Sequence, residues 1–111
     1  MQLSATQAFI AVVAFVMNTA TVQAAQVGSA EQGLRIAREQ CAGCHLLGKE
    51  KGLSTNLQAP TFAKIANTPG MTAAALRIAL STPHRYMPNI IIKSDDADSI
   101  IAYILSLRDL R

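Results

Sequence analysis

Two cysteines and a histidine stand together in the stretch "QCAGCHLL", residues 40–47. Cys41 and Cys44 are the only cysteines of the chain, and His45 follows the second one directly. Thiols at this spacing serve three kinds of chemistry, namely a dithiol–disulfide redox centre, a zinc site, or the covalent attachment of a haem. Each kind needs different surroundings, so the rest of the sequence has to decide among them.

The first two kinds of chemistry find little support around the motif. A redox C-x-x-C of the thioredoxin type lies in a βαβ context, whereas a helical pattern and no strand pattern precedes these cysteines. A structural zinc ion takes four ligands, and the Cys and His candidates are Cys41, Cys44, His45 and His84. Two adjacent residues rarely reach one tetrahedral ion together, so the zinc hypothesis is the weaker of these two.

Haem attachment uses every residue of the motif, because C-x-x-C-H is the pattern of covalent haem sites. Haem carries two vinyl groups on neighbouring pyrrole rings, and two cysteines about one helical turn apart can each form a thioether with one of them. The next residue then lies under the ring plane, where its imidazole can bind the iron. We therefore predict that Cys41 and Cys44 hold one haem c covalently and that His45 is an axial iron ligand.

The second axial ligand decides the function class, because an open iron position binds gases or peroxide and a closed one only passes electrons. The candidates are Met71, Met87 and His84. Met71 begins a predicted helix, where methionine commonly fills a gap in the core. Met87 lies in "RYMPN", between Pro83 and Pro88, and the prolines stiffen a short segment that can return across the haem. We predict Met87 as the sixth ligand, with His84 as the alternative ligand and core packing as the alternative role of Met87.

A helix before the motif is the first element that must position these residues. In "SAEQGLRIAREQ", Ser29 and Gln32 have the spacing of a capping box. Apolar and charged residues then alternate at helical spacing, which predicts a helix from about Ala30 into Gln40 that ends at the cysteines. Residues 46–60 contain Gly, Ser and Asn and are predicted to form a loop.

The remaining elements are also predicted to be helical. A short helix is expected at residues 61–66, and a longer one at residues 71–80 with Thr72 as a possible N-cap and Pro83 beyond its end. In the last helix of the chain, Ser94 or Asp95 is expected to be the cap, and Arg108 and Arg111 suit the negative end of its dipole. Residues 89–92, "NIII", form the only strand-like run, and one strand makes no sheet. The predicted fold class is therefore all-α with long loops.

The N-terminal residues have the features of an export signal. Residues 8–17, "AFIAVVAFVM", are an unbroken apolar run, which is shorter than the ~20 residues of a membrane span and suits a signal-peptide core. Val22 and Ala24 occupy the positions that a signal peptidase reads, although no Lys or Arg precedes the run. We predict a signal peptide at residues 1–24, cleaved after Ala24, and a periplasmic domain at residues 25–111 without a membrane span. The alternatives are an uncleaved anchor and a mispredicted start of the sequence.

Size and composition restrict what the domain can be. Cleavage would leave 87 of the 111 residues, and so small a domain needs a disulfide, a metal or a cofactor to be stable. The formal net charge is +3, and the chain has three Phe, two Tyr and no Trp. Nucleic-acid binding requires more densely placed basic residues and more aromatic side chains for base stacking than this chain has, so it is not expected.

Three stretches together resemble a known family. "CAGCH", "HRYMPN" and "SIIAYILSL" are similar to those of a small bacterial class I c-type cytochrome with one haem, and the resemblance covers about residues 29–107. It implies a cytochrome c fold, in which N- and C-terminal helices cross at nearly right angles and short helices and loops wrap around one covalent haem. It also implies an electron carrier that does no bond chemistry on a substrate and is not an enzyme.

The resemblance also implies roles for single residues. In the family a glycine eight residues before the first cysteine lets the crossing helices approach, and here that is Gly33. Its partners are expected to be Ile100 and Tyr103, with Ile104 against the haem. The carbonyl of Pro60 is placed to accept the Nδ1–H of the histidine ligand, which would orient the ring.

Some positions depart from the family pattern. Ala37 stands where a large aromatic side chain is common, and the chain has no Trp to bond a haem propionate. Tyr86, Arg85 and Asn89 are the candidates for that part. The predicted pocket wall consists of seven apolar residues: Leu46, Phe62, Ile65, Leu80, Ile90, Ile91 and Ile104.

The predicted carrier would be a monomer that meets redox partner proteins briefly, through small interfaces and charge steering. Four cations, Lys49, Lys51, Arg85 and Lys93, are candidates to ring the haem edge and attract an acidic partner; a solvated surface without preference is the alternative. Two other functions stay open, namely a cytochrome subunit of a dehydrogenase or oxidase, and a haem sensor with an open sixth iron position.

Overall fold

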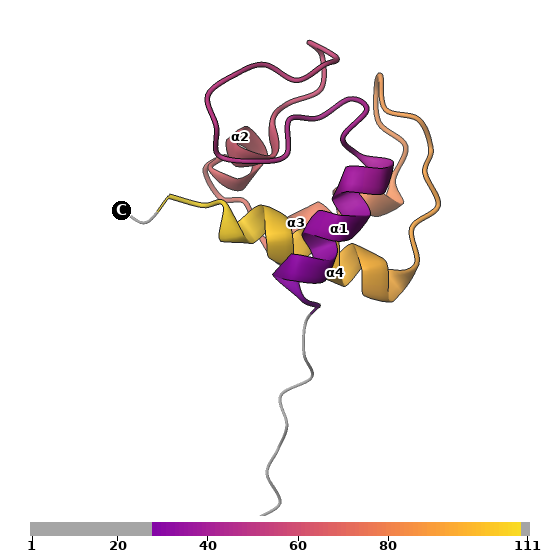
Figure 1. The fold of residues 1–111 in the computed structure, drawn as a ribbon. Helices are drawn as coiled ribbons and strands as arrows, with labels where there is room; N and C mark the ends of the chain where they lie inside the picture. Colours follow the sequence, from indigo (N-terminus) through magenta and orange to yellow (C-terminus); the bar gives the residue numbers. More distant parts are fainter. Residues whose placement is uncertain (1–27, 110–111) are drawn as a thin grey trace, which may run out of the picture.

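Residues 28–109 are described by the computed structural model, and they form four helices. In chain order these are α1 (Ala30–Gln40), α2 (Phe62–Ala66), α3 (Ala73–Ser81) and α4 (Ser94–Ser106). No strand occurs among the described residues, as the all-α prediction requires. Figure 1 shows α1 crossing α4, α2 and α3 beside α4, and two long loops that extend to the same side.

The start of α1 is held by its own cap and by α4. Ser29 Oγ accepts the backbone N–H of Gln32 at 3.3 Å, as predicted. The backbone N–H of Ser29 donates to the hydroxyl of Ser99 on α4 at 3.3 Å. This contact takes the place of the return bond of a capping box, so the cap also ties the two long helices together.

The two shorter helices begin at threonine caps. Thr61 Oγ1 accepts the N–H of Lys64, and Thr72 Oγ1 accepts the N–H of Ala75, each at 3.1 Å. Thr72 confirms the predicted cap, and α3 ends before Pro83 as expected, because the residue preceding a proline is driven into an extended conformation.

The helix α4 departs from prediction at both ends. Its N-cap is Lys93, without a side-chain hydrogen bond, so the predicted cap at Ser94 or Asp95 is wrong. The chain enters the helix one residue earlier, which places both residues in the first turn, where a carboxylate acts on the helix dipole by charge alone. The last turn contains no basic residue, because the helix ends before Arg108. Arg111 lies outside the described residues.

Close contact between α1 and α4 forms the core. A Cβ atom built at Gly33 would lie 1.9 Å from the carbonyl oxygen of Ser99 and 2.9 Å from Cβ of Tyr103. Only glycine permits this approach, as predicted, although Ser99 takes the place that we expected for Ile100. The largest fully buried side chains of the described residues, Ile100 and Ile101, lie on α4 and belong to the core cluster.

The strand-like run at residues 89–92 forms no strand. A strand needs a partner for its backbone groups, and no other strand exists in the described range. Ile91 is 93% exposed there. None of the helices in residues 28–109 is long and apolar enough to cross a membrane. The predicted signal peptide lies outside the described residues.

Candidate functional site

The haem motif continues the turn at the end of α1. The N–H groups of Cys44 and His45 both donate to the carbonyl oxygen of Cys41, at 3.1 and 2.9 Å. These bonds close one further turn, which begins at Cys41 and includes Cys44 and His45. Cys41 is buried and Cys44 is half-buried, and neither forms a disulfide. Burial raises the pKa of the Cys41 thiol, which favours its neutral form.

The imidazole of His45 is fixed by the loop that follows it. Its Nδ1 atom lies 2.6 Å from the carbonyl oxygen of Pro60, the contact that the resemblance implied. A carbonyl oxygen can only accept, so Nδ1 carries the proton and Nε2 keeps a free lone pair. The ring also packs against Phe62, with ring centroids 5.3 Å apart. The ring is thus held in one orientation, with Nε2 available to bind a metal ion.

Hydrogen bonds to backbone groups hold the loop of residues 46–60. The buried hydroxyl of Ser54 accepts the N–H of Leu46 at 3.1 Å, and the N–H of Phe62 donates to the Leu46 carbonyl at 2.9 Å. From α4, the Tyr103 hydroxyl donates to the carbonyl of Leu47 at 2.7 Å. These bonds fix the loop at Leu46 and Leu47 and at Phe62, and therefore hold the Pro60 carbonyl in place for His45.

The predicted site residues line one cavity. It has a volume of about 330 Å³, and Cys41, Cys44, His45 and Met87 all line it. Cofactor pockets commonly have volumes of about 300–1,000 Å³ and apolar walls. Here the wall includes five of the seven predicted apolar residues: Phe62, Ile65, Leu80, Ile90 and Ile104.

Two of the wall predictions are wrong, and several apolar wall residues were missed. Leu46 and Ile91 do not line the cavity. Ile91 faces solvent, whereas Ile90 and Ile92 on either side of it are half-buried. The missed residues include Met71, which precedes α3, and Leu76 and Ala79 on α3. The i, i+3, i+4 spacing of Leu76, Ala79 and Leu80 was the available signal for the α3 residues.

A turn at residues 84–87 brings both candidates for the sixth ligand to the cavity. The N–H of Met87 donates to the carbonyl of His84 at 3.2 Å, and Tyr86 has a φ of 67°, in the left-handed region. Met87 is half-buried and His84 is exposed. Nδ1 of His84 lies 3.0 Å from the Thr82 carbonyl. The structure brings together a thioether and an imidazole, and burial favours the thioether.

The polar residues expected near the haem propionates divide into two groups. Tyr86 and Arg85 line the cavity, and the Arg85 guanidinium carbon lies 5.7 Å from the centre of the Tyr86 ring. Asn89 does not line this cavity. Two glutamines that the sequence did not single out, Gln40 and Gln58, line it as well.

The residues present fit a covalently held haem. Two thiols, an oriented imidazole and a half-buried thioether line the same space, and its wall is apolar. In residues 28–109 no three His, Cys, Asp or Glu side chains gather as a metal site would need, so this part of the chain lacks the ligand set for the zinc alternative.

Comparisons with known proteins agree with this chemistry. The family model described as "Cytochrome c" matches residues 30–108. A curated bacterial protein, "Cytochrome c-552" of Bradyrhizobium diazoefficiens, is 31% identical over 97 residues, which cover 87% of this chain and 89% of that relative. No solved structure gives a significant match.

Proposed function

Because this chain belongs to the cytochrome c family, we propose that Cys41 and Cys44 anchor its haem and that His45 and Met87 bind the iron. The chain is a mono-haem electron carrier with one covalently bound haem c. The observation that carries the residue assignment is that all four side chains line one apolar cavity, with His45 Nδ1 held at 2.6 Å by Pro60.

The protein residues determine how the carrier works. When bound, the haem supplies the one-electron chemistry of iron. The hydrogen bond to Pro60 fixes the ring of His45 and raises its strength as a donor. The thioether of Met87 is a soft ligand that favours reduced iron, and the apolar wall acts in the same direction because it excludes water. The residues bind, orient and shield, and we propose that they do no bond chemistry on a substrate.

A pair of substitutions tests the sixth ligand. Met87→Ala should abolish the methionine–iron charge-transfer band and let the reduced protein bind carbon monoxide at once. His84→Ala, the matched control on the same turn, should keep the band and exclude carbon monoxide. If the unmodified protein lacks the band, and His84→Ala rather than Met87→Ala lets the reduced protein bind carbon monoxide, the sixth ligand is His84. Avid carbon monoxide binding by the unmodified protein would instead favour the sensor alternative.

The distribution of charge supports an acidic redox partner. No Asp or Glu occurs between residues 51 and 94, the segment that supplies most of the cavity wall and rim. Lys49, Lys51 and Lys93 are exposed, and Arg85 lines the cavity. We propose that these cations steer a monomeric carrier to an acidic partner. The rate of electron exchange with such a partner should fall as ionic strength rises; a rate independent of salt would contradict the steering.

Export to the periplasm is part of the same proposal. The predicted signal at residues 1–24 supports it, and the mass of the mature protein after expression with haem-attachment machinery tests it. A mass that corresponds to residues 25–111 plus one haem is expected. A haem-loaded protein that retains residues 1–24 would favour an uncleaved anchor.

A second function has one observation in its favour. Large apolar side chains are exposed on both loops, with Leu53 at 78%, Leu57 at 77% and Ile91 at 93%. A cytochrome subunit of a dehydrogenase or oxidase would cover such side chains permanently. Co-purification with a catalytic chain in stable stoichiometry would support this alternative over the free carrier.

A further inference from the structure

Arg108, just beyond α4, reaches back to a different part of the fold. Its Nε donates to the carbonyl of Ala66 at 3.2 Å, and its Nη2 donates to the carbonyl of Met71 at 2.6 Å. Ala66 is the last residue of α2, and Met71 directly precedes the cap of α3. One guanidinium thus holds both ends of the α2–α3 linker, residues 67–72. In Figure 1 the end of α4 lies beside α2.

The neighbouring residue strengthens this attachment. The N–H of Asp109 donates to Oδ1 of Asn67 at 2.9 Å, and Nδ2 of Asn67 donates to the Ala63 carbonyl at 2.9 Å. The linker is therefore bound to the C-terminal segment at its beginning by Asn67 and across its whole length by Arg108.

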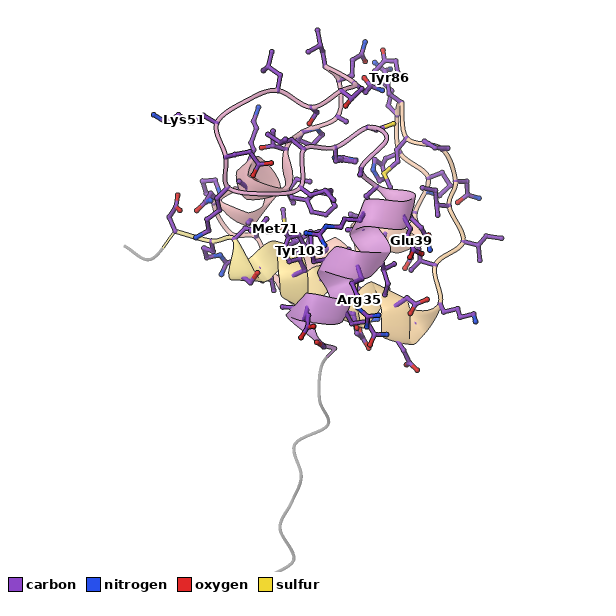
Figure 2. The ribbon with its side chains drawn as sticks, in the orientation of Figure 1. Arg35, Glu39, Lys51, Met71, Tyr86 and Tyr103 are labelled. Atoms are coloured by element: carbon purple, nitrogen blue, oxygen red, sulfur yellow. The ribbon has the colours of Figure 1, made fainter. Side chains whose placement is uncertain are left out.

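The linker carries one side of the haem cavity. Met71, labelled in Figure 2, lines the cavity, as do Ile65 just before the linker and Leu76 and Leu80 on α3. A shift of the linker would move these side chains together, because Met71 and the start of α3 are attached to it directly. The position of this wall thus depends on the two carbonyls that Arg108 holds.

Arginine suits this position for a physical reason. Its planar fork can donate to two separate oxygens at once, and a charged donor makes stronger bonds to carbonyls than a neutral one. In residues 28–109 the observed ion pair joins Arg77 to Asp98, and Arg108 pairs with no carboxylate there. Its donors are used on backbone carbonyls instead.

We propose that Arg108 is a positioning residue for the haem, which holds the wall formed by residues 65–80 closed and thereby sets the reduction potential. The apolar shell around a redox site controls its access to water and its dielectric, and both set the potential. A looser wall would admit water and stabilise the oxidised iron. The inference rests on the haem occupying this cavity.

Three variants of the haem-loaded protein separate positioning from charge. Arg108→Gln removes the charge and the fork, whereas Arg108→Lys keeps the charge and removes the fork. Arg35→Gln removes one charge from the exposed side of α1, where Arg35 makes no side-chain hydrogen bond or ion pair with the described residues. The potential is measured by spectroelectrochemistry, and exchange of the linker amides by hydrogen–deuterium exchange.

We expect the ratio of reduced to oxidised protein at a fixed ambient potential to fall three- to tenfold in both Arg108 variants, where tenfold corresponds to 59 mV for one electron. Arg35→Gln should change the ratio less than twofold. The amide of Met71, which donates to the Thr68 carbonyl at 3.0 Å, should exchange faster in both Arg108 variants and normally in the Arg35 variant.

Several results would overturn the proposal. If Arg108→Lys matches the unmodified protein while the two glutamine variants fall together, charge alone sets the potential. Unchanged potentials, or unchanged exchange in the linker, would also refute it. If Arg108→Gln fails to fold, Arg108→Lys decides alone. The spectrum of the unmodified protein tests the iron ligands separately, so a failure of that assignment is distinguishable from a failure at Arg108.

Discussion

The substitution Gly33→Ala sets helix propensity against the crossing of α1 and α4. Alanine in place of glycine inside a helix stabilises it by about 1 kcal/mol. At this position the new Cβ would lie 1.9 Å from the Ser99 carbonyl oxygen, although contacts below 3.0 Å essentially never occur. The helices would have to separate locally by at least the difference, 1.1 Å. We expect the steric cost at the helix crossing to exceed the gain in helix propensity.

The size of this free-energy cost depends on which atom the new Cβ would clash with. Overpacking in a core costs about 1–3 kcal/mol, and the upper part of that range applies because the struck oxygen is backbone that cannot rotate away. After the gain in propensity, about 2 kcal/mol of destabilisation remains. For a domain of this size that corresponds to a fall in melting temperature of about 8–16 °C.

Thermal and denaturant unfolding of the haem-loaded protein, followed by helical circular dichroism, measure this difference. Gln32→Ala is the control, because it places the same alanine side chain on the exposed side of the same turn, away from the crossing. That variant should melt within a few degrees of the unmodified protein, as surface substitutions usually change stability by less than about 0.5 kcal/mol. A Gly33→Ala protein as stable as the unmodified one would refute the close crossing.

Three further perturbations test the cavity and its loop. Tyr103→Phe should cost about 1 kcal/mol of unfolding free energy, because Leu47 loses its hydroxyl donor. Burial and the Glu50 carboxylate raise the pKa of Tyr103 above 10.0. The hydroxyl therefore contributes its full stabilisation below pH 10.0, and this stabilisation is lost as the pH rises through the folded-state pKa. Thermal unfolding of Tyr103→Phe at alkaline pH should not show this loss. Ser54→Ala leaves the Leu46 N–H without its acceptor and should cost about 1–2 kcal/mol in denaturant unfolding. Replacing both cysteines by serine should give a protein without covalent haem, checked by mass, that is less helical and unfolds less cooperatively.

Residues that act through local chemistry could be predicted from the sequence. The threonine cap of α3 and the turn of the haem motif depend on neighbours a few residues away, and both form as expected. Gly33 and Pro60 act over a longer range, and their places came from the resemblance to a family. Chain geometry alone would not have paired the ring of His45 with a carbonyl fifteen residues away.

Features that depend on distant side chains were not predictable in the same way. Arg108 was expected to serve the dipole of its own helix, and instead it binds carbonyls 42 and 37 residues away. Nothing in the local pattern distinguishes these two uses, because each places a cation after a helix end. Likewise the apolar run at residues 89–92 gives no sign of which isoleucine faces the cavity, since that depends on the path of an irregular loop.

The small core explains why so many loop contacts end on backbone carbonyls. Ile100 and Ile101 are the largest side chains that are fully buried, and several other apolar residues face the cavity instead of each other. Such a wall gains its full burial only against the haem, so side-chain packing cannot fix the loops before the haem is attached. Hydrogen bonds from Tyr103 and Arg108 to carbonyls near the cavity are made entirely between groups of the protein. Directional bonds of this kind attach both the loop of residues 46–60 and the α2–α3 linker to the C-terminal part of the chain.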